Sequence, residues 1–377
     1  MPFLRRNKII TKKIKVALGI ITKKALTGPI EVSVDLTRKC TLDCLMCWWR
    51  SPLLEKQPSS EWSNQAMDYE LFKELIRDFK KLKIKRIILG GQGDPMLYPK
   101  LFEVMELTKK AGIEVALITS GFYLTEKKVR SLFDLQIDCL DISLQAATSE
   151  TYLRLHPGQR KDTFSRIKNH LMLLSKLKKE AHQNVPDVRI IHIICSLNYH
   201  ETVKVIEFAT EVGADSIGYK RVDVTTQTKE LLLNEKQLEE FQELLNEAEK
   251  KAIELGIGTG IKTFRKFILK GLTTGIYTTD FYSQIPCYVG WNSSRILETG
   301  DVIPCCGCYD VILGNIKQNS FIDIWYSDTY QKFRKQALHL DKKAVRKAGC
   351  KCYSCVDYGT NLGIYGRLHP IKAKEIS

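Results

Sequence analysis

The 377-residue chain has no long apolar run. A helix that crosses a bilayer needs about 18 or more consecutive apolar residues, and no segment reaches that length. The basic N-terminal segment also lacks the apolar core and cleavage site of a secretory signal. No internal repeat or low-complexity tract is present. We therefore expect a cytoplasmic protein, long enough for a barrel-sized domain and a smaller appendage.

Acidic residues are absent from residues 1–28, whereas eight Lys and Arg of a chain with net charge +15 lie there. A helix in this segment would have lysines on one side and an apolar side made of Ile10, Ile14, Ala17 and Ile21. We favour a helix that covers the bottom of a barrel and exposes its lysines to water. The alternative partner is an anionic membrane surface, which would make the protein peripheral on the inner membrane surface. Nucleic acid is not favoured, because no interleaved aromatic residues or known reader motif accompany the basic residues.

Short apolar runs alternate with amphipathic stretches through the next two thirds of the chain. The runs are 30–36, 86–89, 114–119, 139–144, 188–195 and 216–219. The helical stretches lie near 68–82, 99–111, 125–134, 162–178, 200–212 and 235–255. Repeated β-α units predict a parallel sheet with crossover helices, and nearly continuous apolar strands predict a sheet covered on both faces. The predicted fold class is α/β, with a partial (β/α)6 TIM-like barrel over residues 29–258.

The last third of the chain has a different composition. Helical periodicity fades from about residue 262, and Gly, Thr, Tyr and Cys become frequent. This predicts a loop-rich linker over 259–286 and a small cysteine-rich domain over 287–377.

Twelve cysteines are many for a chain without an export signal. Clustered thiols that stay reduced indicate metal binding rather than disulfides. Three of them form the run Cys40-x3-Cys44-x2-Cys47, directly after the first predicted strand. Iron–sulfur clusters usually have four cysteine ligands, so three thiolates would leave one iron open to a small molecule. On spacing alone, a zinc site with a distant fourth ligand is also possible.

Small and polar side chains recur at the ends of four predicted strands. They stand in Gly90–Pro95, Thr119–Gly121, Ser143–Gln145 and Cys195–Asn198. Barrel enzymes bind ligands at the carboxyl ends of their strands, so these groups are expected above one mouth. Glycines there let a ligand approach the backbone, and the carboxylate of Asp94 can accept a hydrogen bond from an ammonium group.

With these motifs the chain resembles the radical S-adenosylmethionine (SAM) superfamily over roughly residues 30–255. Gly90–Pro95 stands in the place of the family's Gly-Gly-Glu-Pro, and Thr119–Gly121 in the place of Thr-Asn-Gly. Two departures are visible. Met46 precedes the third cysteine where the family usually has an aromatic residue. Asp94 replaces the glutamate, and Gly93 lengthens the turn.

The resemblance implies a [4Fe-4S] cluster on Cys40, Cys44 and Cys47 with SAM on its open iron. An electron donor such as flavodoxin or ferredoxin would start SAM cleavage to a 5′-deoxyadenosyl radical, which abstracts hydrogen from an organic or peptide substrate. The implied SAM-binding residues are Met46, Gly90, Gly91, Gln92, Asp94, Ser120, Ser143, Gln145, Arg160 and Asn198. Among these, Met46 and Asn198 would lie near the adenine. Arg160, with Arg154 as the second choice, would bind the carboxylate.

The C-terminal cysteines resemble the auxiliary-cluster region called twitch, the shortened form of the SPASM domain. Cys287 is followed after twelve residues by Gly300 and after four more by Cys305, and Cys352-x2-Cys355 comes later. The resemblance implies an auxiliary [4Fe-4S] cluster on these four cysteines, with a hairpin over 296–304 and a helical stretch over 321–338. The cysteines left over would be alternative ligands, a hydrogen-atom donor or buried thiols: Cys306, Cys308 and Cys350.

These features predict a radical SAM oxidoreductase that modifies a peptide, sugar or lipid-linked substrate, with net oxidation assisted by the auxiliary cluster. Candidate catalytic groups that would deprotonate the substrate are Asp223, Asp280 and Tyr282. Lys220 and Arg221 can hold a carboxylate. The alternatives are a peptide epimerase-type enzyme with a cysteine hydrogen donor, a zinc-binding scaffold and a tRNA-modifying radical enzyme.

Overall fold

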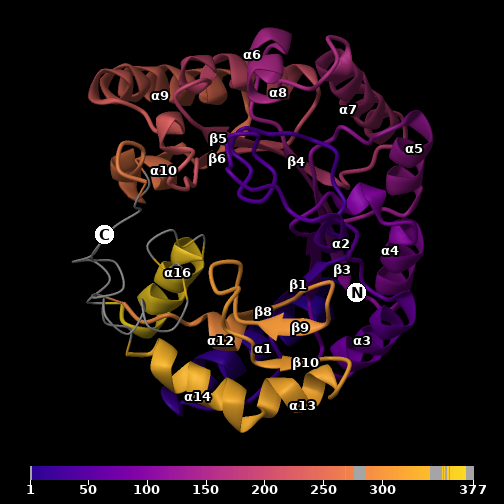
Figure 1. Cartoon of the computed structure of the whole chain (residues 1–377). Helices are drawn as coiled ribbons and strands as arrows, with labels where there is room; N and C mark the ends of the chain where they lie inside the picture. Colours follow the sequence, from indigo (N-terminus) through magenta and orange to yellow (C-terminus); the bar gives the residue numbers. More distant parts are fainter. Residues whose placement is uncertain are drawn as a thin grey trace.

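The computed structural model describes residues 2–267, 269–275, 285–339, 350, 352, 355 and 357–370. Figure 1 shows a curved sheet inside a C-shaped ring of helices. The described strands form one sheet in the order β10-β9-β8-β1-β2-β3-β4-β5-β6-β7. The C-terminal strands therefore continue the sheet of the N-terminal domain.

All six predicted strands are present, and consecutive ones pair in parallel. They are β1 (Glu31–Asp35), β2 (Arg86–Gly90), β3 (Glu114–Thr119), β4 (Cys139–Ser143), β5 (Asp187–Ile194) and β6 (Ser216–Arg221). The helices that follow them form the outer layer of Figure 1. They are α3 (Tyr69–Lys81), α4 (Leu101–Lys110), α5 (Glu126–Asp134), α7 (Thr163–Glu180), α8 (Lys204–Glu211) and α9 (Glu235–Leu255). The prediction of a partial (β/α)6 barrel is confirmed.

Short elements escaped the sequence analysis, because one or two turns carry too little periodicity to detect. They are α2 (Ser60–Ser63), α6 (Ser149–Leu155), η1 (Pro95–Leu97), η2 (Tyr199–Glu201) and η3 (Lys229–Leu231). The predicted linker also has structure at its start. It contains β7 (Gly258–Thr259), which pairs with β6, then α10 (Ile261–Phe267) and η4 (Leu269–Gly271).

Strand residues alternate between the helical layer and the inside of the barrel. In β1, Val32 and Val34 are completely buried in the main hydrophobic core. The inward-facing residues include polar ones that pair between neighbouring strands. Arg86 of β2 lies 2.9 Å from Glu114 of β3. The inside of the barrel therefore carries polar pairs, whereas the surface under the helices is apolar.

The C-terminal hairpin joins the barrel at the free edge of β1. Strand β8 (Ser293–Ile296) pairs in parallel with β1, β9 (Asp301–Ile303) returns antiparallel to β8, and β10 (Gly314–Asn315) pairs with β9. The predicted turn is confirmed, since Gly300 has a φ of +92°, which suits glycine. Helices cover this region: α12 (Val289–Asn292), α13 (Phe321–Tyr326), α14 (Asp328–Ala337) and α16 (Tyr358–Leu368).

The N-terminal helix α1 (Pro2–Ile21) lies at the N-terminal ends of the strands. The Lys12 ammonium donates to the carbonyl of Leu82, shortly before β2, at 3.1 Å. The prediction of its buried side is wrong, because Ile14 and Ile21 are exposed whereas Val16 is buried. The opposite side packs on the aromatic residues near α12, a contact that helical periodicity cannot reveal. Among the described helices, none is both long and apolar enough to cross a membrane.

Candidate active site

The loop that carries Cys40, Cys44 and Cys47 leaves the carboxyl end of β1 and is fixed to the far side of the barrel mouth. The Leu45 N–H donates to the Leu155 carbonyl at 3.0 Å. The Gly158 N–H donates to the Asp43 carboxylate at 2.5 Å. These bonds tie the loop to the region of α6, so it spans the mouth from β1 toward β4.

The turn after β2 supports the start of the cysteine loop. The Asp94 N–H donates to the Lys39 carbonyl at 2.9 Å. A Cβ on Gly93 would lie 2.5 Å from both the Arg38 carbonyl carbon and the Lys39 carbonyl oxygen. No side chain fits there, which explains the glycine that lengthens this turn.

The three thiols of the loop are close enough to influence one another. Burial raises the pKa of the Cys44 thiol, and the neighbouring Cys47 and Cys40 thiols raise it further. Burial also raises the pKa of Cys40. Metal binding requires deprotonated thiolates, so a bound cluster would supply the positive charge that this site lacks. The donor set, three thiols at the barrel mouth, fits a four-iron cluster with one open corner.

In the part of the chain that the structure describes, no three His, Cys, Asp or Glu side chains converge on one metal position.

Asp94 joins the ends of β2 and β3. Its carboxylate accepts hydrogen bonds from the Thr119 hydroxyl (2.9 Å), the Ser120 hydroxyl (2.6 Å) and the N–H groups of Ser120 (2.9 Å) and Met96 (3.0 Å). A carboxylate has about four acceptor positions, so these donors use its capacity. We therefore assign Asp94 the role of positioning Ser120. Its predicted bond to the SAM ammonium stays a prediction.

The residues predicted at the fourth and fifth strand ends have different roles. Gln145 donates to the Ser143 hydroxyl at 2.7 Å, at the end of β4. Asn198 is completely buried. Its amide donates to the Gln145 and Ile193 carbonyls and accepts from the Cys195 N–H, each at 2.8 Å. Asn198 therefore links β4 to β5, and its position near the adenine stays a prediction.

Met46 and the glycines after β2 lie where the prediction placed them, around the mouth. Met46 packs against the small buried cluster that contains Leu155, Cys195 and Val222. Gly91 has a φ of +141°, and a Cβ there would lie 2.8 Å from the Asp35 carboxyl carbon. Gly90 ends β2. The backbone at Gly91 is thus exposed at the barrel mouth and packs on Asp35 of β1.

Arg160 lies in the turn between α6 and α7. Its side chain is 81% exposed, and its Nε lies 3.2 Å from Asp162. Arg154 is also exposed. The role of Arg160 as a carboxylate ligand, with Arg154 as the second choice, stays a prediction.

Of the three predicted catalytic groups, the structure describes only Asp223. Its carboxylate pairs with the buried Arg221 at 2.9 Å, and its carbonyl accepts from the Trp48 indole at 3.0 Å. Asp223 therefore stands beside the cysteine loop at the end of β6. Asp280 and Tyr282 lie outside the described residues.

A buried ion pair that the sequence analysis missed joins the barrel to the C-terminal hairpin. Arg295 of β8 forms a two-pronged bond with Asp35 of β1, at 3.0 and 2.8 Å. Burial raises the pKa of Asp35, and Arg295 opposes this rise. The guanidinium also lies 5.5 Å from the Tyr309 ring, which contacts Trp49 of the cysteine loop edge-on. The two residues of the pair are 260 positions apart, so no local pattern indicates it.

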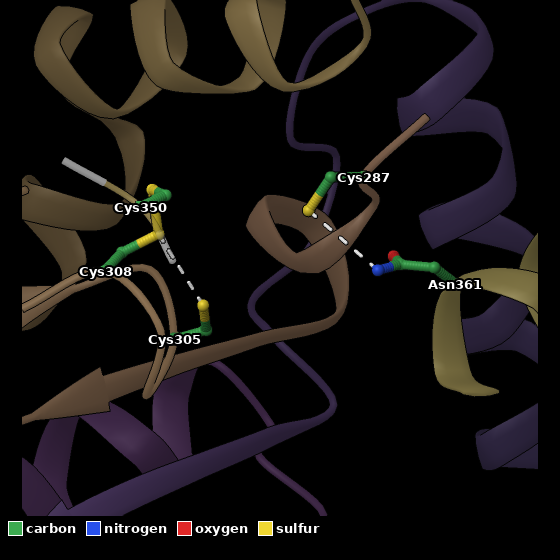
Figure 2. Close-up of a disulfide and its surroundings, with 5 residues drawn as sticks. All are labelled: Cys287, Cys305, Cys308, Cys350 and Asn361. Atoms are coloured by element: carbon green, nitrogen blue, oxygen red, sulfur yellow. Dashed lines mark hydrogen bonds between the residues drawn. A yellow bond between two sulfur atoms is a disulfide. The ribbon is translucent and has the colours of Figure 1, made fainter. Parts of the chain in front are cut away.

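The four predicted auxiliary ligands gather between the hairpin and α16. Burial raises the pKa of Cys305, and its neighbours Cys355 and Cys287 add to this rise. Burial raises the pKa of Cys287 to about 12, with Cys352 contributing. Figure 2 shows Cys287 beside Asn361 of α16, and Cys305 beside Cys308. The donor set fits an auxiliary iron–sulfur cluster with four cysteine ligands.

Two of the three remaining cysteines form a disulfide, Cys308–Cys350 (Figure 2). The expectation that clustered cysteines stay unpaired is therefore wrong for this pair. The fold brings them together because the segment after β9 and the late cysteines meet beside Cys305, whose sulfur lies 3.7 Å from that of Cys308. Cys306 remains a free thiol. Its charged neighbours include Arg295, Lys220 and Asp223.

Comparison with protein families identifies the class of protein. Residues 34–209 match the radical SAM superfamily, and residues 287–356 match SPASM, an iron–sulfur cluster-binding domain. The chain belongs to the radical SAM superfamily and has a C-terminal SPASM domain. Its cofactors are therefore a [4Fe-4S] cluster, SAM and an auxiliary iron–sulfur cluster.

Individual relatives are distant. The chain is 23% identical to a tungsten-containing aldehyde ferredoxin oxidoreductase cofactor-modifying protein of Pyrococcus furiosus, over 80% of this chain and 82% of the relative. It is 25% identical to the PqqA peptide cyclase of Rhizobium meliloti, over 88% and 84%. The fold matches Streptococcus suis SuiB bound to precursor peptide SuiA, with a TM-score of 0.61 and 17% identity over 84% of this chain and 69% of that one.

Proposed function

We propose that this chain oxidises a peptide substrate held in the barrel mouth between the two cysteine groups. When bound, the reduced N-terminal cluster and SAM supply a 5′-deoxyadenosyl radical. In this proposal Cys40, Cys44 and Cys47 hold that cluster. The auxiliary cluster has Cys287, Cys305, Cys352 and Cys355 as its ligands.

The observation that carries the proposal is the continuous sheet from β10 to β7. Because β8 pairs in parallel with β1, the C-terminal hairpin extends the same sheet that carries the cysteine loop, and β9 returns antiparallel to β8 before the chain reaches Cys305. Arg295, Tyr309 and Trp49 then form a half-buried bridge between the two groups. A substrate above this bridge would face SAM on one side and an electron acceptor on the other.

The oxidation requires the loss of two electrons and two protons from the substrate. One C–H hydrogen atom leaves to the 5′-deoxyadenosyl radical, one electron passes to the auxiliary cluster, and one proton leaves to a base. Asp223, which pairs with the buried Arg221, would take this proton. Asp280 and Tyr282 remain candidates for the same role. A flavodoxin or ferredoxin would supply the electron that starts the cycle.

A peptide with an acidic residue is the substrate class we favour. The names of two relatives refer to peptides, the PqqA peptide cyclase and SuiB bound to precursor peptide SuiA. In this chain, Lys220 is the penultimate residue of β6, on the inside of the barrel, and its side chain is exposed. Its ammonium can pair with a substrate carboxylate.

Anaerobic reconstitution of the full chain with iron and sulfide tests the proposal. We expect about eight irons per chain, from two four-iron clusters, and 5′-deoxyadenosine after reduction with SAM present. Replacing Cys40, Cys44 and Cys47 together by Ala should leave about four irons and abolish 5′-deoxyadenosine. Continued formation of 5′-deoxyadenosine by this variant would contradict the assigned cluster site.

A second variant tests the auxiliary site. Replacing Cys352 and Cys355 by Ala should leave about four irons and spare SAM cleavage, but stop substrate oxidation. Cys139→Ala is the matched control, because this free cysteine of β4 belongs to neither group and should leave the iron content unchanged. An unaltered iron count in the double variant would exclude Cys352 and Cys355 as ligands.

A redox-neutral reaction is the second candidate, favoured by the position of Cys306. This free thiol has Lys220 and Asp223 of the β6 end among its neighbours. A thiol there can return a hydrogen atom to the substrate radical and so invert a carbon centre; the thiyl radical left behind would regain its thiol form with one electron from the flavodoxin or ferredoxin and one proton from water. The two reactions differ in product mass. Epimerisation in D2O adds one deuterium at unchanged oxidation state and needs Cys306, whereas oxidation removes two hydrogens and survives Cys306→Ala.

A further inference from the structure

Helix α1 has two apolar sides, and only one of them is covered by the protein. Val16 and Ile20 face inward at 5% and 6% exposure. On the opposite side, Ile14, Leu18 and Ile21 are 53%, 47% and 66% exposed. These three positions follow the i, i+4, i+7 spacing of one helix side. We call them the outward face.

The inward side is anchored, so the helix cannot turn to bury the outward face. The Lys12 ammonium donates to the Leu82 carbonyl at 3.1 Å, and Trp291 donates to the Lys24 carbonyl at 3.2 Å. A Cβ on Gly19 would lie 2.6 Å from the Lys24 carbonyl oxygen, so the chain after the helix packs directly on this glycine. Exposure of the outward face is therefore a consequence of the fold.

The exposed large hydrophobic residues of the described chain are concentrated around the outward face. Of the ten exposed large hydrophobic residues among the residues described, four fall between positions 14 and 26. Clustered exposed apolar residues in a monomer mark an interaction site, whereas scattered ones need no explanation.

Lysines border the outward face on both sides. At about 100° per residue, Lys13 and Lys15 project to opposite edges of it. Lys23 and Lys24 follow the helix, and all four side chains are exposed. The first 28 residues of the sequence contain no acidic residue. This surface is thus apolar in the middle and positively charged around it.

We propose that the outward face of α1 binds the surface of a bilayer that contains anionic lipids. Ile14, Leu18 and Ile21 would enter the boundary of the acyl chains, and the lysines would stay at the headgroups. Charge decides against a second copy of the chain, because two such faces would bring their lysine borders together. The inference goes beyond the proposed function. Since α1 lies at the N-terminal ends of the strands, bilayer contact leaves the barrel mouth open.

Co-sedimentation of the full reconstituted chain with lipid vesicles tests this proposal. We expect binding to vesicles of phosphatidylcholine with phosphatidylglycerol, little binding to phosphatidylcholine alone, and weakening at high salt because the lysines are screened. Replacing Ile14, Leu18 and Ile21 together by Ser should weaken binding at least about a hundredfold. Their exposure means that this triple variant should keep its iron content and SAM cleavage.

One further variant tests the lysines beside the outward face, and two control variants change the same residue types elsewhere on the protein. Replacing Lys13, Lys15, Lys23 and Lys24 by Gln should cost about fivefold per lysine. Replacing four exposed lysines elsewhere by Gln gives the same net charge and should keep most of the binding: Lys127, Lys179, Lys229 and Lys250. Ile253→Ser, which removes a 77% exposed isoleucine from α9, should also bind normally.

Three results would overturn the proposal. The first is no binding of the native chain to anionic vesicles. The second is equal loss of binding in the α1 lysine variant and its charge-matched control. The third is a native dimer that the triple Ser variant converts to a monomer in light scattering, because the outward face would then belong to a second copy.

Discussion

The buried pair of Asp35 and Arg295 allows a quantitative test of how the two domains are joined. The Asp35 side chain is 1% exposed and that of Arg295 is 14% exposed. Removing one partner of a buried pair leaves an uncompensated charge, which costs about 3–5 kcal/mol. We therefore expect Arg295→Gln to lower the free energy of unfolding by about this amount near pH 8.

The pH dependence of the same variant follows from the pKa of Asp35. Burial already raises this pKa above 3.8, and loss of Arg295 removes the charge that opposes the rise. A carboxyl group whose pKa is higher in the folded state stabilises the fold when protonated and loses this effect as the pH rises. The deficit of Arg295→Gln should therefore shrink as the pH is lowered from 8 toward the raised pKa.

Guanidinium unfolding of the reconstituted chain, followed by tryptophan fluorescence without oxygen, measures these changes. The double variant Asp35→Asn/Arg295→Gln carries neither buried charge, so it should cost at least about 2 kcal/mol less than the sum of the single variants. Arg130→Gln is the control, since its pair with Glu126 is exposed on a helix and contributes about 0.2–1 kcal/mol.

The reasoning would be refuted if Arg295→Gln cost no more than Arg130→Gln, or if the two single variants were additive. A second readout concerns function. Because the pair fixes the hairpin to β1, its loss should uncouple SAM cleavage from substrate oxidation. The yield of product per 5′-deoxyadenosine should then fall, with the iron content unchanged.

Two further predictions concern the turn after β2. Gly93→Ala would place a Cβ 2.5 Å from the cysteine-loop backbone, so the iron bound after reconstitution should fall to about four per chain. The control Gly260→Ala, whose Cβ would have no atom within 4 Å, should keep about eight irons. Equal iron contents in the two variants would disprove the contact. Asp94→Asn removes an acceptor of several hydrogen bonds and should destabilise the fold by about 1–3 kcal/mol and slow SAM cleavage, more than Ser120→Ala does. Denaturant unfolding and 5′-deoxyadenosine formation measure this, and a milder effect of Asp94→Asn than of Ser120→Ala would contradict the positioning role.

The barrel could be predicted from sequence because its signals are local. A strand covered on both faces needs a continuous apolar run, as in β3 (Glu114–Thr119), and the prediction for that strand matches its bounds. The hairpin turn could also be predicted from a local signal, the glycine at position 300, which has the positive φ that a glycine tolerates. The cysteine spacings were readable for the same reason, because a cluster loop is a local arrangement of ligands.

The surroundings of individual polar residues could not be predicted. Asn198 follows β5 and its amide bonds to three backbone groups, whereas Arg160 lies between α6 and α7 with an exposed side chain. Position along the chain indicates which end of the barrel a residue occupies. It does not indicate whether neighbouring backbone groups already use its hydrogen-bonding atoms.

The sequence by itself determined the order of strands and helices, the ligand-bearing loops and the family, because periodicity and ligand spacing act over a few residues. Only the tertiary structure decided which side of α1 is buried, that Asp35 meets Arg295, and that Cys308 meets Cys350. These contacts join residues far apart in the chain. They depend on how complete elements pack, which no local pattern encodes.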